Sequence, residues 1–180
     1  MKNSIKILIM DVDGTLTDGK IYMGEHGEVF KVFDIKDGFG IHDLLIPSGI
    51  RPIIMTGRES IILENRCKEL GMEKPYQGIK DKLHKLDEIL YAMNHLEINV
   101  GMDIGHNGEY ALYNYENVAY IGDDINDLQC MRSIKLAGGI IGCPCDAVFQ
   151  VKEIADFVSG KNGGCGAVRE FIEWLLFERE

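Results

Sequence analysis

The sequence has few basic residues. It carries 19 Lys and Arg against 29 Asp and Glu, which gives a formal net charge of −10 over 180 residues. Binding to a nucleic-acid backbone needs clustered Lys and Arg, and the sequence holds no such cluster. We therefore expect no nucleic-acid partner. A small anionic substrate is compatible with this charge if local positive charge or a bound cation attracts it.

Long hydrophobic runs are also missing. No segment approaches the roughly 20 apolar residues that a membrane-spanning helix needs, so we expect no membrane partner. Near the N-terminus, Asp11 interrupts the apolar run at 7–10, which leaves that run too short for the core of a signal peptide. These two absences predict a cytoplasmic protein, and its length fits one domain with a sizeable core.

Cysteine and histidine are present without the spacing of a metal or disulfide site. Cys143 and Cys145 flank a single proline, which is not the spacing of a zinc knuckle or a thioredoxin-like pair. The five histidines also lack ligand spacing. We therefore expect the five thiols to be reduced, and we assign neither residue type any chemistry.

The chain does contain a repeated alternation of apolar runs and helical patterns. Apolar runs at 5–10, 53–55 and 118–121 each end in a polar, glycine-containing turn and precede a helical pattern. Runs that are apolar on both faces are typical of a parallel sheet covered by helices. We predict an α/β fold with a doubly wound, mostly parallel, Rossmann-like sheet, as one domain over residues 1–180.

The remaining elements are predicted from periodicity and stop signals. Helical patterns occupy residues 39–47, 60–70, about 83–96 and 168–176, with Gly49 and Gly71 as stops after the first two. Apolar residues alternate on either side of a turn at 24–27, which predicts a β-hairpin insertion at about 19–34.

Polar residues follow each predicted strand. Asp11 and Asp13 lie two apart on an extended chain, so both carboxylates point the same way where the first strand ends. Taken alone, this pair also fits a simple turn in which one Asp caps the backbone. The later groups are Thr56, Gly57 and Arg58, then Lys82, then the segment at 122–127. Because the carboxyl ends of the strands share one edge of the sheet, we expect all four groups to converge there.

Convergence would bring up to five carboxylates into one crevice. They are Asp11, Asp13, Asp123, Asp124 and Asp127. Such a group repels itself, and some members must take up protons unless a cation lies among them. Oxygen ligands with few His or Cys favour Mg²⁺, so we predict a magnesium cofactor.

The four motifs resemble, in the same order, those of the haloacid dehalogenase superfamily, and the match spans nearly the whole chain. The resemblance implies a phosphatase in which Asp11 attacks phosphorus to form an aspartyl-phosphate. Asp13 would then protonate the leaving alcohol and later activate water.

The same resemblance assigns the supporting residues. It implies phosphate or substrate binding by Thr56, Gly57, Arg58, Lys82 and Asn126. It implies a metal held by the Asp11 carboxylate, the Asp13 backbone carbonyl and Asp123, with support from Asp124 and Asp127.

The spacing of the motifs leaves no room for an independent cap domain. Asp13 and Thr56 are 43 positions apart, and Thr56 and Lys82 are 26 apart. This resembles the capless branch of the superfamily, whose open site needs either a large substrate or a lid from a neighbouring subunit.

Further motifs resemble the family of 3-deoxy-D-manno-octulosonate 8-phosphate phosphatases, which act in lipopolysaccharide biosynthesis. They include Asp18-Gly19, Phe33-Asp34, Asp37-Gly38, Arg66-Cys67, Gln77-Gly78 and the segment at 163–170. The resemblance implies a homotetramer assembled through the hairpins. It also implies that a C-terminal tail covers an adjacent subunit's site, with Gly163, Gly164, Gly166 and Arg169 as its lid residues.

Several alternatives stay open at this stage. Relatives of this architecture also hydrolyse 9-phosphates of nonulosonates such as N-acylneuraminate. Arg58 favours the octulosonate, whose carboxylate or phosphate it could bind, but it could equally pair with Glu59 or Glu64. A receiver-like phosphoacceptor switch also combines acidic residues, Thr and Lys on such a sheet. The segment at 101–115 is longer than the family's usual connection, and we assign it no function.

Overall fold

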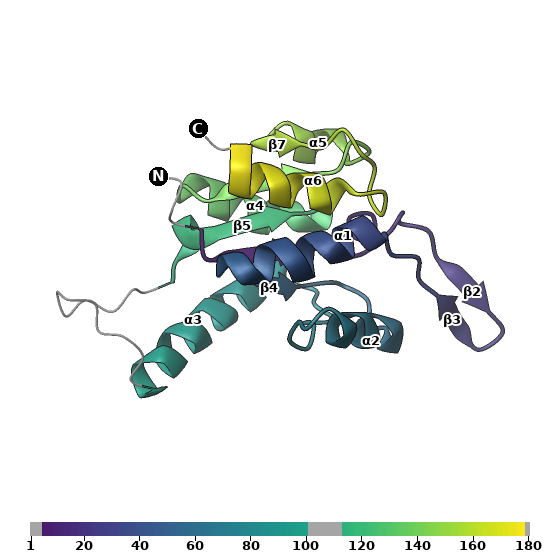
Figure 1. Ribbon diagram of the computed structural model, residues 1–180, viewed down its shortest axis with the longest axis horizontal. Helices are drawn as coiled ribbons and strands as arrows, with labels where there is room; N and C mark the ends of the chain where they lie inside the picture. The colour runs from purple at the N-terminus through teal and green to yellow at the C-terminus, as the bar shows by residue number, and fades with distance from the viewer. Residues whose placement is uncertain (1–4, 101–112, 179–180) are drawn as a thin grey trace.

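The computed structural model describes residues 5–100 and 113–178 (Figure 1). Its centre is a five-stranded sheet in the order β4-β1-β5-β6-β7, in which every neighbouring pair is parallel. The strands are β1 (Ile7–Met10), β4 (Arg51–Ile54), β5 (Val118–Ile121), β6 (Ile140–Cys143) and β7 (Phe157–Val158). The predicted parallel α/β fold is confirmed.

Helices cover both faces of the sheet. One face packs α3 (Lys82–Val100), α4 (Ile125–Leu136) and α5 (Phe149–Lys152), and the other packs α1 (Ile35–Phe39), α2 (Ile61–Glu69) and α6 (Ala167–Glu173). The two faces separate along β1, where Ile7 and Ile9 join one apolar cluster and Leu8 and Met10 join the other. Successive strand residues point to opposite faces, so an unbroken apolar run of this kind requires helices on both sides.

Short helical turns of other types adjoin the regular helices and strands. The π-helix η2 (Gly40–Leu45) and the 3₁₀ turn η3 (Ile46–Ser48) continue α1, the 3₁₀ turn η4 (Tyr115–Asn117) precedes β5, and the π-helix η5 (Trp174–Glu178) continues α6. The first helix ends at Gly49, with φ +81°, as predicted. It begins earlier than predicted, because the Asp34 carboxylate caps it by accepting from the Lys36 N–H at 2.6 Å.

Two outer strands, β6 and β7, were not predicted. Gly142 interrupts the apolar pattern of β6, and its place in the structure explains why a glycine stands there. A Cβ on Gly142 would lie 2.7 Å from the ring of Phe171 on α6. The glycine is therefore explained by close packing against a distant helix, which strand propensity alone does not reveal.

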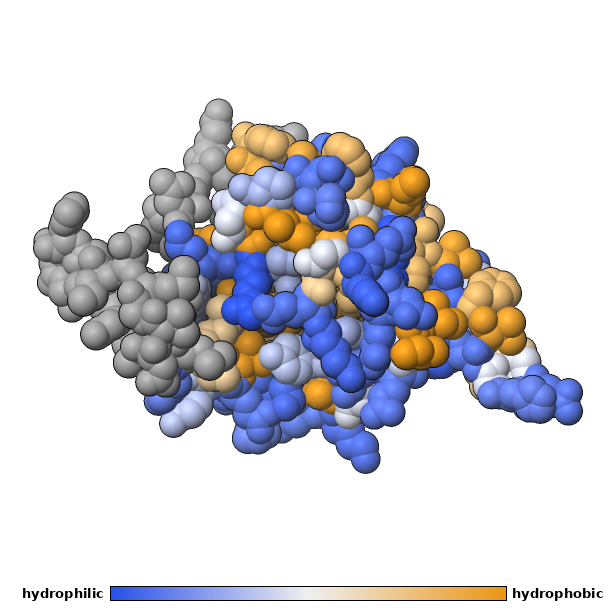
Figure 2. Space-filling model, turned by 60° about the horizontal axis from the view of Figure 1, so that its bottom comes forward, coloured by the Kyte–Doolittle hydropathy of each residue, from blue (hydrophilic) through white to orange (hydrophobic). Residues whose placement is uncertain are grey.

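The predicted hairpin is confirmed as β2 (Tyr22–Gly24) paired antiparallel with β3 (Gly27–Phe30). It projects from the body of the molecule (Figure 1). Its apolar side chains face outward, with Met23 64% and Val29 60% exposed. Figure 2 shows apolar side chains gathered where the hairpin leaves the body, and a hydrophilic tip.

The described residues contain no separate cap domain. Between Asp13 and Thr56 lie the hairpin, the first helix and β4, and between Thr56 and Lys82 lies α2. Within the part of the chain that the structure describes, no helix is both long and apolar enough to cross a membrane. Most of the segment at 101–115 lies outside the described residues.

Candidate active site

The segments after β1, β4 and β5 meet at one edge of the sheet. The Asp11 N–H donates to the Ile121 carbonyl at 3.0 Å, and the Met55 N–H donates to the Met10 carbonyl at 3.1 Å. β1 lies between β4 and β5, so connections leave it in both directions. The strand order therefore reverses beside β1, which is where ligands bind in open α/β sheets.

Lys82, the first residue of α3, occupies the middle of this edge. It is 4% exposed, and its Nζ lies 2.6 Å from Asp11 Oδ1 and 2.6 Å from Asp127 Oδ1. Burial opposes its charge, but the two carboxylates outweigh burial and raise the pKa of Lys82 above its usual value. One ammonium therefore joins the loop after β1 to the first turn of α4.

Asp127 is held by several donors at once. Besides Lys82, Oδ1 accepts the Tyr120 hydroxyl at 2.6 Å, and Oδ2 accepts the Asp123 N–H at 3.2 Å. A Cβ on Gly122 would lie 2.4 Å from Asp127 Oδ2, so the glycine makes this approach possible. Both carboxylate oxygens of Asp127 therefore already accept hydrogen bonds from the protein.

Asp123 lies against the loop after β1. Its Oδ1 accepts the Thr15 hydroxyl at 3.0 Å. Gly14 has φ +96°, and a Cβ there would lie 2.1 Å from Asp123 Oδ2. Gly14 and Thr15 thus allow Asp123 to approach the loop after β1.

Asp11, Asp123 and Asp127 form an acidic cluster that fits a divalent cation. Each offers a carboxylate oxygen within 4.8 Å of the others. Burial, followed by repulsion from neighbouring carboxylates, raises the pKa of Asp11 and of Asp123 to about 7. Two buried carboxylates and a half-buried one, with a single ammonium shared by Asp11 and Asp127, lack compensating positive charge, and such an all-oxygen donor set suits Mg²⁺.

The Asp13 side chain points to a different group of residues. Its Oδ1 lies 2.5 Å from Lys31 Nζ, and its Oδ2 lies 3.9 Å from Arg58 Nε. The guanidinium of Arg58 donates to Glu28 Oε1 at 3.3 Å. Arg58 thus pairs with Glu28 of the hairpin rather than with Glu59 or Glu64, the alternative partners that the sequence left open.

The other predicted site residues differ in burial. Thr56 is buried and its Oγ1 accepts the Arg58 N–H at 3.4 Å, whereas Gly57 is exposed. Asn126 is exposed in the first turn of α4, and the exposed Asp124 caps that helix by accepting from the Ile125 N–H. An open groove of about 600 Å³ adjoins the loop after β4. Its lining includes Glu59, Ser60, Tyr76, Gln77 and Ile79.

The glycine-rich C-terminal segment contacts the loop after β1 of its own chain. The Gly164 N–H donates to the Thr15 carbonyl at 3.0 Å, and a Cβ on Gly163 would lie 1.9 Å from the Gly14 carbonyl oxygen. Gly166 precedes α6 with φ +97°. A role as a lid over a neighbouring subunit stays a prediction.

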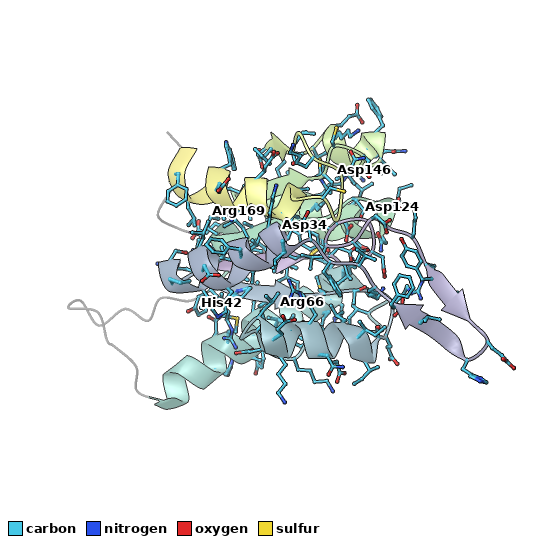
Figure 3. All side chains as sticks on the ribbon, turned by 45° about the vertical axis from the view of Figure 1, so that its right-hand side comes forward. Asp34, His42, Arg66, Asp124, Asp146 and Arg169 are labelled. Carbon is cyan, nitrogen blue, oxygen red and sulfur yellow. The ribbon has the colours of Figure 1, made fainter. Side chains whose placement is uncertain are left out.

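Arg169 lies away from the acidic cluster of Asp11, Asp123 and Asp127. It pairs with Glu173 at 2.6 Å, and its guanidinium lies over the Phe39 ring. Figure 3 shows it on α6 beside α1, whereas Asp124 lies nearer the base of the hairpin.

Sequence reasoning missed two residues of this site, Tyr120 and Lys31, and it noted Asp37 only as part of a motif. Tyr120 reads as an ordinary core residue in an apolar strand, and Lys31 as a surface residue of a hairpin. Asp37 is buried and accepts the Arg169 N–H at 2.7 Å. Tyr120 and Lys31 each act through a partner on another element, so no local pattern points to either of them.

Comparisons with known proteins agree on one kind of enzyme. No protein-family model matches the chain. Over 173 residues it is 38% identical to 3-deoxy-D-manno-octulosonate 8-phosphate phosphatase KdsC of Escherichia coli, covering 96% of this chain and 80% of the relative. The phosphatase of that name from Yersinia pestis superposes with a TM-score of 0.81 at 37% identity, covering 97% of this chain and 82% of that one.

A third relative was solved with its ligands. The 3-deoxy-D-manno-octulosonate 8-phosphate phosphatase from Moraxella catarrhalis, in complex with a magnesium ion, a phosphate ion and a KDO molecule, superposes with a TM-score of 0.74. It is 35% identical and covers 97% of this chain and 87% of that one. The likeness thus extends over nearly all of the present chain.

Proposed function

Because the chain belongs to the 3-deoxy-D-manno-octulosonate 8-phosphate phosphatases of the haloacid dehalogenase superfamily and is a phosphatase, we propose that it hydrolyses this 8-phosphate with Mg²⁺. The observation that carries the proposal is the buried Lys82 between Asp11 and Asp127 at the edge of the sheet, in a chain so similar to those enzymes. A receiver-like switch is not proposed, since the family is one of phosphatases.

Asp11 is the proposed nucleophile. Its Oδ1 is held by Lys82 at 2.6 Å, which orients the carboxylate and leaves Oδ2 to attack phosphorus. The attack forms an aspartyl-phosphate and breaks the bond to the sugar oxygen. Lys82 stays beside the reacting group and offsets its negative charge.

Asp13 is the proposed acid and base. It gives a proton to the departing sugar oxygen, and then accepts one from the water that hydrolyses the aspartyl-phosphate. Its carboxylate is half-buried and outside the acidic cluster, so the two acids of the first motif have different surroundings. We propose that Thr56 and the exposed Gly57 N–H bind the phosphoryl oxygens.

The proposed metal ligands are Asp11, Asp123 and the Asp13 carbonyl, and Mg²⁺ bound there would neutralise charge on the phosphoryl group. Asp127 and Asp124 support them, the former through Lys82 and Tyr120. The magnesium in the Moraxella catarrhalis enzyme supports this choice of ion.

Arg58 is the proposed contact to the sugar acid. Its side chain is 35% exposed and lies beside Asp13, so it can reach a substrate carboxylate once it leaves Glu28. Asn126, exposed on α4, is proposed as a further substrate contact. A nonulosonate 9-phosphate is the alternative substrate, because it carries the same carboxylate and a primary phosphate ester.

We further propose one phosphatase domain over residues 1–180 that assembles as a homotetramer. The outward apolar face of the hairpin supports association, since an isolated exposed hairpin with such a face is only marginally stable. The glycine-rich segment, including Gly163, Gly164, Gly166 and Arg169, would then cover the open site of an adjacent subunit.

The decisive experiment is the variant Asp11→Asn, assayed on a panel of eight- and nine-carbon keto-acid phosphates. We expect the variant to fold and to release no phosphate, because an amide cannot replace the nucleophile. We expect the wild-type protein to give its highest kcat/KM on the octulosonate. Retained turnover by Asp11→Asn would overturn the mechanism. A higher kcat/KM on a nonulosonate 9-phosphate would show that this compound, and not the octulosonate, is the preferred substrate.

A further inference from the structure

Lys31 lies directly after β3, outside the acidic cluster. Its side chain is 4% exposed, although the hairpin residues on either side of it, Phe30 and Val32, are exposed. Its Nζ lies 2.5 Å from Asp13 Oδ1 and 3.1 Å from Glu28 Oε1. A buried ammonium between two carboxylates is fixed in place, because any movement would leave a charge unpaired.

Glu28 is itself anchored, so Lys31 has a rigid support. Glu28 Oε2 accepts the Ser60 hydroxyl at 2.6 Å, and Oε1 accepts from the Arg58 guanidinium at 3.3 Å. Both donors lie on the loop that follows β4. The hairpin is therefore tied to that loop through Glu28 and to the loop after β1 through Lys31.

The two oxygens of Asp13 are consequently not equivalent. Oδ1 accepts a charge-assisted hydrogen bond from Lys31, whereas the nearest guanidinium nitrogen of Arg58 stays 3.9 Å from Oδ2, beyond hydrogen-bond distance. Lys31 thus fixes the rotation of the carboxylate and leaves Oδ2 free to exchange a proton.

We propose that Lys31 is a positioning residue for Asp13, which it holds in the orientation needed for proton transfer to the leaving alcohol. The proposal rests on the proposed function, in which Asp13 is the acid. A misplacement of about 1 Å can cost about 100-fold in rate. General acid catalysis contributes about 10²–10⁴-fold, which bounds the loss that a mispositioned Asp13 can cause.

Two substrates with different leaving groups can distinguish a positioning role of Lys31 from a merely structural one. A sugar alkoxide leaves only when it is protonated, whereas dinitrophenolate is a stable anion and leaves without an acid. In Lys31→Met we therefore expect kcat/KM to fall about 10- to 100-fold on the sugar 8-phosphate and less than about threefold on dinitrophenyl phosphate. Lys20→Met is the matched control: its side chain is 72% exposed in the same excursion, and both constants should stay unchanged.

Equal losses on the two substrates in Lys31→Met would show a general structural role and overturn the proposal. So would an unchanged kcat/KM on the sugar phosphate. If Lys31→Met does not fold, the double variant Lys31→Met/Glu28→Gln, which also neutralises the stranded Glu28, carries the same comparison. Asp13→Asn, assayed in parallel, tests the proposed function separately: if it turns over the sugar phosphate normally, Asp13 is not the acid, whatever Lys31 does.

Discussion

At the scale of single residues, the site is organised by a shortage of positive charge. Lys82 is shared by Asp11 and Asp127, while among the described residues Asp123 has only the Thr15 hydroxyl as its side-chain donor. Charged groups this deeply buried are costly unless they are paired. Two consequences can be measured, one for the ammonium and one for the carboxylates.

Replacing the ammonium should destabilise the protein and stop catalysis together. In Lys82→Met, two buried carboxylates lose their common partner, so we expect the free energy of unfolding without magnesium to fall by about 3–5 kcal/mol. Phosphate release should fall by at least about 100-fold. Urea unfolding and steady-state assays measure the two effects. Lys80→Met, at an exposed lysine two residues earlier, should change neither; an unfolding free energy unchanged in Lys82→Met would refute the shared ion pair.

Magnesium should stabilise the protein more at high pH than at low pH. The pKa of Asp11 and of Asp123 is raised from 3.8 to about 7 in the folded state without metal. Between these values the folded protein binds more protons than the unfolded chain, so its stability without metal falls as the pH rises through this window. Mg²⁺ competes with those protons, and its stabilisation should therefore grow over the same range.

Thermal unfolding with magnesium or with EDTA tests this linkage. The magnesium-induced rise in Tm should be small near about pH 5 and largest near about pH 8, on either side of the raised pKa values. Asp123→Asn should lose most of the effect, because it removes one ligand and one of the repelling charges. A rise in Tm that is independent of pH would contradict the proposed ligand set.

At the scale of elements, α6 is held to the first helix by one carboxylate. Asp37 accepts the Arg169 N–H at 2.7 Å and the Gly166 N–H at 3.3 Å, both at the start of α6. The first residues of a helix have N–H groups without helical partners, and Asp37 satisfies them from outside the helix. Because Gly164 bonds to Thr15, the position of α6 also affects the loop after β1.

Removing that carboxylate should loosen α6 without changing the chemistry directly. We expect Asp37→Ala to lower the free energy of unfolding by about 1–3 kcal/mol, the cost of leaving buried donors unpaired. Chemical denaturation measures the loss. Asp43→Ala, at an exposed position on η2, serves as the control and should have little effect. If Asp37→Ala is as stable as Asp43→Ala, the hydrogen bonds from α6 to Asp37 do not stabilise the protein.

At the scale of the whole molecule, the hairpin is the element on which the proposed assembly depends. Ile21, Met23, Val29 and Phe30 are each about half exposed or more. A projecting strand pair with such an apolar face presents edges that a second copy can cover.

A charge on that face should dissociate the proposed tetramer. We expect light scattering of the wild-type protein to give about four times the 20.2 kDa chain mass, and Val29→Lys to reduce it, because a buried unpaired ammonium is costly in an interface. Glu25→Lys, at the exposed hairpin turn, should leave the mass unchanged. A wild-type protein that runs as a monomer would refute the assembly.

The sequence by itself determined the parallel class of the sheet and three of its strands, the hairpin and the order of the site segments. The apolar runs that became β1, β4 and β5 are local signals, and so are the turn at 24–27 and the stop at Gly49. Parallel strands place their carboxyl ends at one edge whatever surrounds them. The convergence of Asp11, Lys82 and Asp123 therefore followed from order along the chain alone.

Only the tertiary structure decided how the charges are paired. Lys31 with Asp13, Arg58 with Glu28, and Tyr120 with Asp127 each join different elements, and nothing local favours them over nearer partners such as Glu59. The need for glycine at position 142 likewise comes from the ring of Phe171. Pattern and propensity describe neighbours along the chain, whereas buried ion pairs and close packing are fixed by which elements the fold brings together.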